Sequence, residues 1–149
     1  MVFWSEAYLC ALLLYEVYDP QGKRMGRLQD VLAQPNGRFP EVTKIAVRRK
    51  GTSSIEYYPW SAVRTASPEG IRLNAVEPVQ PSETEIHLRR DLVDKQIVDV
   101  SGKRVVRVHD LKLGAIGGQV LLTHADVGWR GVLRRLGWEH FTLHLCRAL

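Results

Sequence analysis

The first part of the chain alternates apolar and polar residues with the two-residue period of a β-strand. In "RMGRLQDVL", Gly26 and Leu28 are expected on one side of a strand, with Arg27 and Gln29 on the other. A short apolar run, "VYD", precedes this strand, and "PQGK" between them carries the Pro and Gly of a tight turn. The pattern therefore predicts a hairpin over residues 17–32.

Further short strands are expected after this hairpin. The segments "VTKIAVRR" and "SIEYYPW" are rich in β-branched and aromatic residues and flank a turn at Lys50 and Gly51, so they predict a second hairpin. A further strand is expected at "GIRLNAV". The prolines and polar residues of "EPVQPSETE" break the pattern and predict a linker. Several short strands without a long helical period favour a small β-barrel.

The first hairpin is written a second time, eighty residues later. "VYDPQGKRMGRLQDV" (17–31) is followed by "IVDVSGKRVVRVHDL" (97–111), in which Val106 and Val108 take the apolar side and Arg107 and His109 the polar side. After it, "GGQVLLTHADV" matches the strand that begins at Val42. The identical residues are Asp19, Gly22, Lys23, Arg24, Arg27 and Asp30, which recur as Asp99, Gly102, Lys103, Arg104, Arg107 and Asp110. We interpret the repeat as one structural unit that occurs twice.

The end of the chain departs from the repeat. In "DVGWRGVLRRLGW" the apolar residues have the spacing of an amphipathic helix, with Asp126 as a possible cap and Gly137 as an interruption. These apolar residues are Trp129, Val132, Leu133 and Leu136. The predicted fold is mainly β: two tandem small barrels over 1–80 and 81–149, the second incomplete, with a short C-terminal helix.

Both halves resemble the photosynthetic reaction-centre (PRC) barrel family. The resemblance covers roughly residues 10–77 and 88–127 and rests on "VYD", the Gly turn, the basic strand that closes on Asp, and "YPWSAV". That family includes a domain of the reaction-centre H subunit and the C-terminal domain of the ribosome maturation factor. The tandem arrangement with "DVGWRGVLRRLG" is more similar to the region that precedes magnesium-transporter-type intracellular and CBS domains in bacterial proteins. The second copy has no counterpart of "YPWSAV", so either the chain is a fragment of a longer protein or the second barrel closes in another way.

Net charge, cysteine content and the apolar N-terminal run indicate the cellular environment of the chain. The net charge of +5 is spread along the chain without a basic tail, which is weak support for a polyanion partner. Cys10 and Cys146 lie in apolar surroundings outside any CxxC motif, so a reduced, cytoplasmic setting is expected. The run "AYLCALLLY" is too short to span a bilayer and is bracketed by Glu6 and Glu16. We interpret it as a buried segment of the fold rather than a membrane anchor.

The recurring carboxylates could form acid–base or Mg²⁺ sites. Because Asp19, Asp30 and their counterparts lie beside turns, we instead expect their side chains to accept backbone N–H bonds. Asp91 and Asp94 are surrounded by Arg89, Arg90 and Lys95, and no tight Mg²⁺ site is expected there. A metal site at His140 and His144 is a weaker interpretation than structural histidines. No cofactor is expected.

Basic and aromatic side chains are the candidate partner-binding residues. Basic residues at 48–50 could contact phosphates and Tyr57 and Tyr58 could stack on bases, but burial is the preferred fate of Trp60. For Trp129 and Trp138, helix-face packing competes with contact to a partner. The candidate partner-binding set is Arg24, Arg27, Arg104, Arg107, Trp129, Arg130, Arg134, Arg135 and Trp138.

Two functions compete. The first is a non-catalytic protein-interaction or regulatory module whose partner is another protein or downstream domains of the same chain; the resemblance links it to magnesium transport. The alternative is a ribosome- or RNA-associated maturation factor, and an enzyme is not expected. The apolar face of the C-terminal helix and the open edge of the second barrel also favour a homodimer formed through the C-terminal region.

Overall fold

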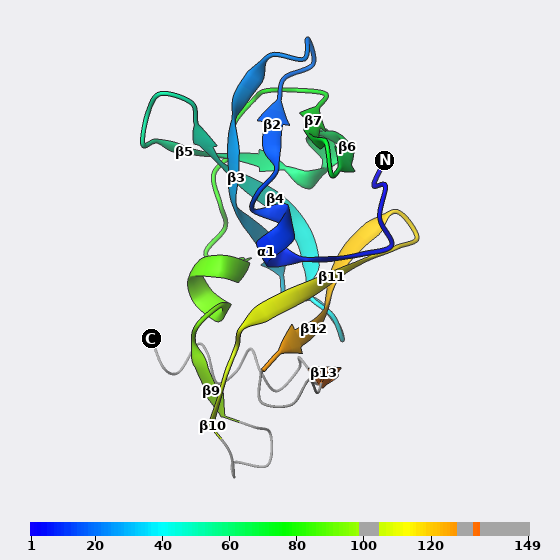
Figure 1. Ribbon diagram of the computed structural model, residues 1–149, viewed down its shortest axis with the longest axis vertical. Helices are drawn as coiled ribbons and strands as arrows, with labels where there is room; N and C mark the ends of the chain where they lie inside the picture. The colour runs from blue at the N-terminus through cyan, green and yellow to red at the C-terminus, as the bar shows by residue number, and fades with distance from the viewer. Residues whose placement is uncertain (99–104, 128–132, 135–149) are drawn as a thin grey trace.

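A computed structural model describes residues 1–98, 105–127 and 133–134 of the chain (Figure 1). The elements of the first half are β1 (Glu6–Tyr8), α1 (Leu9–Leu12), β2 (Glu16–Tyr18), β3 (Arg24–Gln34), β4 (Glu41–Arg49), β5 (Ile55–Pro59), the 3₁₀ turn η1 (Trp60–Ala62), β6 (Val63–Ser67) and β7 (Gly70–Leu73). Those of the second half are β8 (Ile86–His87), the π-helical turn η2 (Leu88–Leu92), β9 (Gln96–Val98), β10 (Val105–Arg107), β11 (Asp110–Ile116), β12 (Gln119–Asp126) and β13 (Leu133–Arg134).

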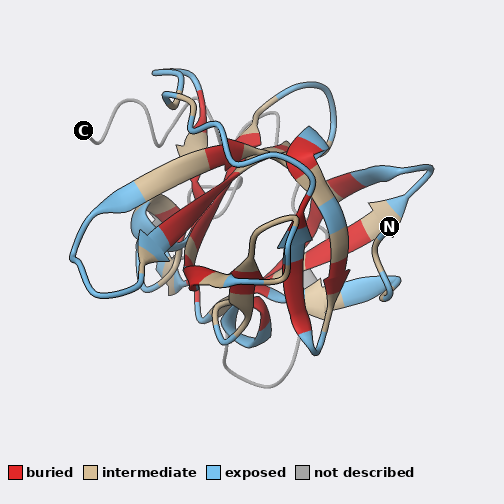
Figure 2. Cartoon of the chain, turned by 90° about the horizontal axis from the view of Figure 1, so that it is seen from above, coloured by how far each residue is buried: buried red, intermediate tan, exposed pale blue. Residues whose placement is uncertain are grey.

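Eleven of these strands form one curled, half-barrel sheet. Its main path runs β1-β11-β12-β4-β3-β2-β7-β6, while β5, β8 and β13 attach at its side, and β9 and β10 form a separate hairpin. The sheet bends around the buried residues, which gather along the strands in Figure 2. The expected alternation is present, since Gly26 and Leu28 are buried and Arg27 is exposed. The mainly β prediction is thus confirmed, as are both first-half hairpins and the strand at 70–73.

The repeat is visible in the strand register. In the first hairpin Glu16 lies opposite Arg27, and in the second Gln96 lies opposite Arg107, each residue shifted by eighty positions. The longer β3–β4 ladder is repeated by β11–β12 in the same way, because Asp30 pairs with Ala46 and Asp110 with Asp126. Even the β-bulge after Leu32 recurs after Lys112. The strand pairing of β2, β3 and β4 thus recurs in β9, β10, β11 and β12, as the structural repeat predicts.

The first strand and helical turn of each half pack against the opposite half. β1 pairs with β11 of the second half, with Tyr8 opposite Lys112, and β8 pairs with β3 of the first half, with His87 opposite Leu32. The two pairings are equivalent: Tyr8 corresponds to His87, 79 residues later, and Leu32 corresponds to Lys112, 80 residues later. The extra residue in the second copy coincides with the π-helical turn η2, where the first copy has the α-helical turn α1.

Two equivalent aspartates hold these exchanged turns. The Asp30 carboxylate accepts the backbone N–H groups of Arg89 (2.7 Å) and Arg90 (3.1 Å) at the start of η2. Asp110 accepts the N–H of Cys10 in α1 at 3.2 Å. Each carboxylate also accepts the N–H of the residue that follows it. The expected role as backbone acceptors is confirmed, and part of the donors come from the opposite half of the chain.

One buried glycine of the first copy is replaced by a larger residue in the second. Gly26 lies on β3 between two neighbouring strands, and a Cβ atom there would fall 1.9 Å from the carbonyl oxygen of Arg48. The equivalent residue in the second half is Val106. Val106 belongs to β10, which pairs only with β9 among the described strands.

The two-barrel and C-terminal predictions need correction in detail. Strands of both halves share one curled sheet, so two separate tandem barrels are not what the described residues show; the boundary at residue 80 stays a prediction. Leu133 and Arg134, expected on a helix, form β13, which pairs with β12 much as β5 pairs with β4. The expected cap, Asp126, is the last residue of β12. The rest of the predicted helix lies outside the described residues.

The apolar N-terminal run forms β1 and α1 rather than a long element. Leu9 and Leu12 are buried as expected, whereas Leu14 is 73% exposed. Among the residues described, the helical segments are all too short or too polar to cross a bilayer.

The aspartates give a first test. Asp30→Ala should lower the free energy of unfolding by about 2–3 kcal/mol, because it leaves three backbone N–H groups around a buried site without an acceptor. Asp110→Ala is the matched variant and should cost about 1 kcal/mol, since it strands only two donors at a more exposed position. Urea denaturation at constant m-value measures both. Equal losses of unfolding free energy in the two variants would contradict the larger contribution expected of Asp30.

The exchange of strands gives a second test. Fragments 1–80 and 81–149 should each be poorly folded alone, because each lacks the strand and turn that complete its sheet. Mixing them should restore a dispersed amide NMR spectrum close to that of the intact chain. A well-dispersed spectrum from fragment 1–80 alone would show that the exchange is dispensable.

Candidate partner-binding surfaces

The two candidate arginines of the first hairpin are already paired. Both Arg24 and Arg27 form ion pairs with Glu16 on the neighbouring strand β2, Arg27 at 3.7 Å. The register places Glu16 directly opposite Arg27, so this neutralisation follows from the pairing of β2 with β3. Glu16 offsets one of the two positive charges, which makes these arginines weaker candidates for an acidic partner than the sequence suggested.

The second hairpin keeps an arginine but lacks the acid. Gln96 occupies the position of Glu16, and Arg107 is exposed without an ion pair to any residue that the structure describes. Val105, two residues before it, is 65% exposed. The hairpin β9–β10 extends away from the main sheet in Figure 1. Arg104 lies outside the described residues. The second hairpin thus exposes a cation beside an apolar side chain, where the first hairpin has an ion pair.

Most of the candidate partner-binding residues at the C-terminus lie outside the described part of the chain. Trp129, Arg130, Arg135 and Trp138 lie outside the described residues. Arg134 belongs to β13, where its backbone pairs with Ala125. Association of two copies through this region stays a prediction.

The aromatic residues that could stack on bases pack within the fold. Tyr58 is 1% exposed, and the half-buried Trp60 packs against the hydrophobic core, as expected for it. Tyr57 makes an edge-to-face contact with the His87 ring at a centroid distance of 5.8 Å. Phosphate-binding through Arg48 and Arg49 would therefore lack the adjacent stacking platform that the sequence suggested.

The carboxylates and the described cysteine have structural partners. Asp19 accepts the backbone N–H of Lys23 at 2.8 Å, which confirms its expected place in the turn. Asp91 pairs with Arg90 at 2.7 Å and also accepts the N–H of His87. No group of three metal-ligating side chains occurs within residues 1–98 and 105–127. The neighbouring Asp110 carboxylate raises the pKa of the exposed Cys10 thiol, which keeps it protonated and less nucleophilic.

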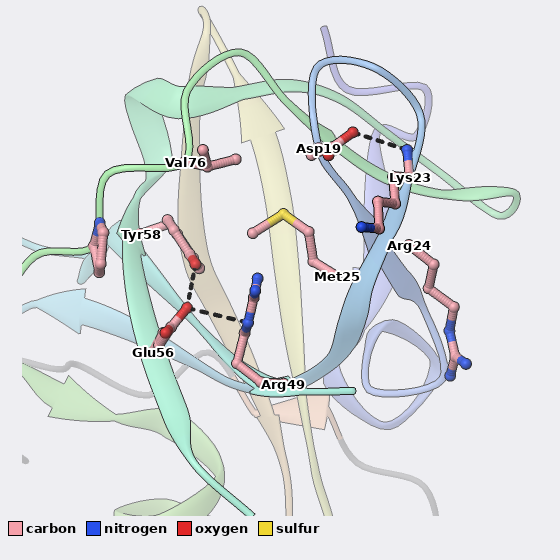
Figure 3. A pocket seen from close by; sticks show the side chains of 9 residues that line it. Asp19, Lys23, Arg24, Met25, Arg49, Glu56, Tyr58 and Val76 are labelled. Atoms are coloured by element: carbon pink, nitrogen blue, oxygen red, sulfur yellow. Dashed lines mark hydrogen bonds and ion pairs between the residues drawn. The ribbon is translucent and has the colours of Figure 1, made fainter. Parts of the chain in front are cut away.

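A hollow beneath the β2–β3 turn was missed by the sequence analysis. It has a volume of about 370 Å³, and Met25 and Tyr58 are its buried lining residues. Lys23 and Arg49 point toward Met25 from opposite sides in Figure 3, whereas Arg24 turns away. The Tyr58 hydroxyl donates to Glu56 at 2.5 Å, and Glu56 also faces Arg49 Nε at 3.4 Å. The recurring residues Asp19, Lys23 and Arg24 gave a sequence signal, but the other walls come from distant strands.

The predicted linker is anchored by one buried glutamate. Glu85 is buried and accepts bonds from Lys44 Nζ (2.5 Å), the Thr43 hydroxyl (2.6 Å) and the backbone N–H of Ser82 (2.7 Å). Burial opposes ionisation of this carboxyl, but these donors outweigh it and lower its pKa. The anchor ties the linker to β4 just before β8 enters the first half.

Comparison with known proteins supplies no family. No model of a known protein family matches the chain, and no curated protein matches it.

The linker anchor predicts a dependence of stability on pH. The pKa of Glu85 is lower in the folded than in the unfolded chain, so its contribution is complete above an unfolded pKa of 4.5 and is lost as the pH falls through the lower folded value. Glu85→Gln should cost about 1–3 kcal/mol at pH 7, because three donors then share one weaker acceptor. The difference from the unmodified chain should shrink below pH 4.5. The control is Glu83→Gln, an exposed change in the same linker, which should be neutral at both pH values.

Proposed function

We propose that this chain is a non-catalytic protein-interaction or regulatory module that binds an acidic surface of a partner. The proposal rests on one contrast between the repeats. Glu16 forms an ion pair with Arg27 in the first hairpin, whereas Gln96 takes that place in the second and Arg107 has no ion pair with a described residue. An exposed cation beside exposed Val105 suits the rim of a protein interface, where charge steers association and apolar contact stabilises it.

The partner is proposed to be another protein or further domains of the same chain. The resemblance to the region that precedes magnesium-transporter-type and CBS domains would connect the module to magnesium transport in a bacterial cytoplasm. The connection is one of fold-level analogy.

A second candidate function is RNA association. Phe3 is 62% exposed and lines a second hollow, of about 470 Å³, together with Arg64 and Arg72. Both arginines lack an ion pair within the described part of the chain. An exposed aromatic ring beside arginines is the combination that single-stranded nucleic acids use for stacking and phosphate contact.

The equivalent arginines supply a matched test. We expect Arg107→Gln to weaken binding of the intact chain to poly-L-glutamate by about two- to fivefold, the range for a single exposed charge contact. Arg27→Gln should have a smaller effect, because Glu16 already compensates that charge. Fluorescence anisotropy with labelled poly-L-glutamate measures both variants.

The same assay separates the two candidate functions. Labelled single-stranded RNA should bind more weakly than poly-L-glutamate at 150 mM salt, about the physiological ionic strength. Equal effects of the two arginine variants would remove the support for the interaction surface at β9–β10. Tight RNA binding that weakens steeply with salt and is lost in Arg72→Gln would favour the RNA-associated function instead.

A further inference from the structure

The hollow lined by Phe3, Arg64 and Arg72 lies at β6 and β7, where the main path of the sheet ends. Its volume of about 470 Å³ is in the range of sites that hold one small ligand. Tyr18 adds a second aromatic ring to its walls, and Glu69 is the one carboxylate among its described lining residues. The hollow therefore combines aromatic and cationic side chains.

A β-bulge brings the two arginines of the hollow to the same face of the β6–β7 hairpin. Arg72 lies opposite Thr65, and both line the hollow, whereas the next residue, Ala66, is buried. Strict alternation along β6 would place Arg64 on the buried face with Ala66. The strand register shifts just before Thr65, however, and a bulge re-aims a side chain in this way. Arg64 is accordingly exposed and lines the hollow with Arg72.

The two aromatic residues are positioned by backbone contacts. The N–H of Phe3 donates to the carbonyl of Ala66 at 3.0 Å, yet the Phe3 side chain is 62% exposed. The Tyr18 ring lies against the backbone of Gly70, since a Cβ atom there would fall 2.8 Å from the ring. Phe3 thus presents to solvent a ring that the core does not use.

The charged groups of the hollow are not consumed by the fold. Arg64, Arg72 and Glu69 form no ion pair with any residue that the structure describes, and the backbone N–H of Glu69 bonds to the Ser67 hydroxyl. Two guanidinium groups against one carboxylate leave a net positive charge. Because a guanidinium group can donate two parallel hydrogen bonds to phosphate oxygens, this pair of arginines suits a phosphate group.

We propose that this hollow binds a nucleoside phosphate, with the phosphate on Arg64 and Arg72 and the base stacked on Phe3. Stacking on an aromatic side chain suits every base, because each base has a π-face. Glu69 suits the ribose, whose hydroxyl groups donate to carboxylates. An inorganic phosphate or a glutamate side chain would leave the Phe3 ring without a stacking partner. The inference goes beyond the acidic-partner function and shares only its hollow with the second candidate function.

A free nucleotide and one unit of an RNA strand present the same chemistry, and probe length separates them. Adenosine 5′-monophosphate (AMP) and hexa-adenylate are titrated into the ¹⁵N-labelled intact chain and followed by amide NMR. We expect progressive shifts at Phe3, Thr65 and Arg72. An affinity for hexa-adenylate within about sixfold of that for AMP, the statistical gain of six equivalent units, identifies a free nucleotide as the ligand. A larger gain identifies an RNA strand, and both results support the site.

Three variants test the roles of the side chains. Arg72→Gln should weaken AMP binding by about five- to tenfold, because it removes a charge-assisted contact to the phosphate. Arg38→Gln is the matched control, because Arg38 is an exposed arginine that lies over the Phe39 ring outside the hollow. It should leave the affinity within about 1.5-fold of the unmodified chain. Phe3→Leu keeps an apolar side chain but should weaken AMP binding about fivefold through lost stacking.

Several outcomes would overturn the proposal. These are no localised shifts at millimolar AMP, equal affinity for adenosine without a phosphate, inorganic phosphate that binds at least as tightly as AMP, or equal effects of the two arginine variants. If poly-L-glutamate binding still depends on Arg107 in those cases, the acidic-partner function stands and only this site is lost. If AMP binds the hollow but Arg107 has no effect, the hollow stands without the β9–β10 surface.

Discussion

The buried carboxylate of Asp30 is the contact on which the join between the two halves depends. It lies at an irregularity of the β3–β4 ladder, where a bulge can redirect a side chain, and it accepts three backbone N–H groups. Burial nevertheless raises its pKa, because those neutral donors do not fully replace water around the charge. The fold accepts this cost because two of the donors would otherwise be unsatisfied N–H groups at the start of η2.

Reciprocal docking explains why the repeat produces one sheet. Asp110 repeats the contact with α1, and the strands next to each turn, β1 and β8, add to the sheet of the opposite half. Leu9 and Leu88, the first residues of the two turns, are fully buried at these joins. Apolar burial and backbone pairing therefore act together at both joins, and neither half can complete its core with its own first segment.

Differences between the copies are where function is expected to reside. The shared residues shape the turns and strands, so they are explained by the fold. The change from Glu16 to Gln96 alters charge without altering the register, and Arg107 is exposed without an ion pair to any residue described in the structure. Similarly, the hollow at Phe3 depends on β6 and β7, which the repeat motif does not include. Both surface features therefore depend on residues that the two copies do not share.

The sequence by itself determined the local structure of the chain. The two-residue alternation around Leu28 and the Gly turn at Gly22 specify the first hairpin through side-chain burial and backbone freedom. The eighty-residue identities specified its copy, and the choice of Asp30 and Asp110 as backbone acceptors was also foreseeable. These properties depend on residues near one another in the chain.

Only the tertiary structure decided which segments meet. Nothing local to Asp30 indicates that two of its donors lie 59 and 60 residues away, because an aspartate accepts any N–H placed beside it. The neutralisation of Arg27 by Glu16 and the convergence of Lys23 with Arg49 likewise depend on strand register and sheet curvature. The pairing of distant strands depends on many weak contacts throughout the core. A periodic pattern within one segment therefore does not predict which other segment it will meet.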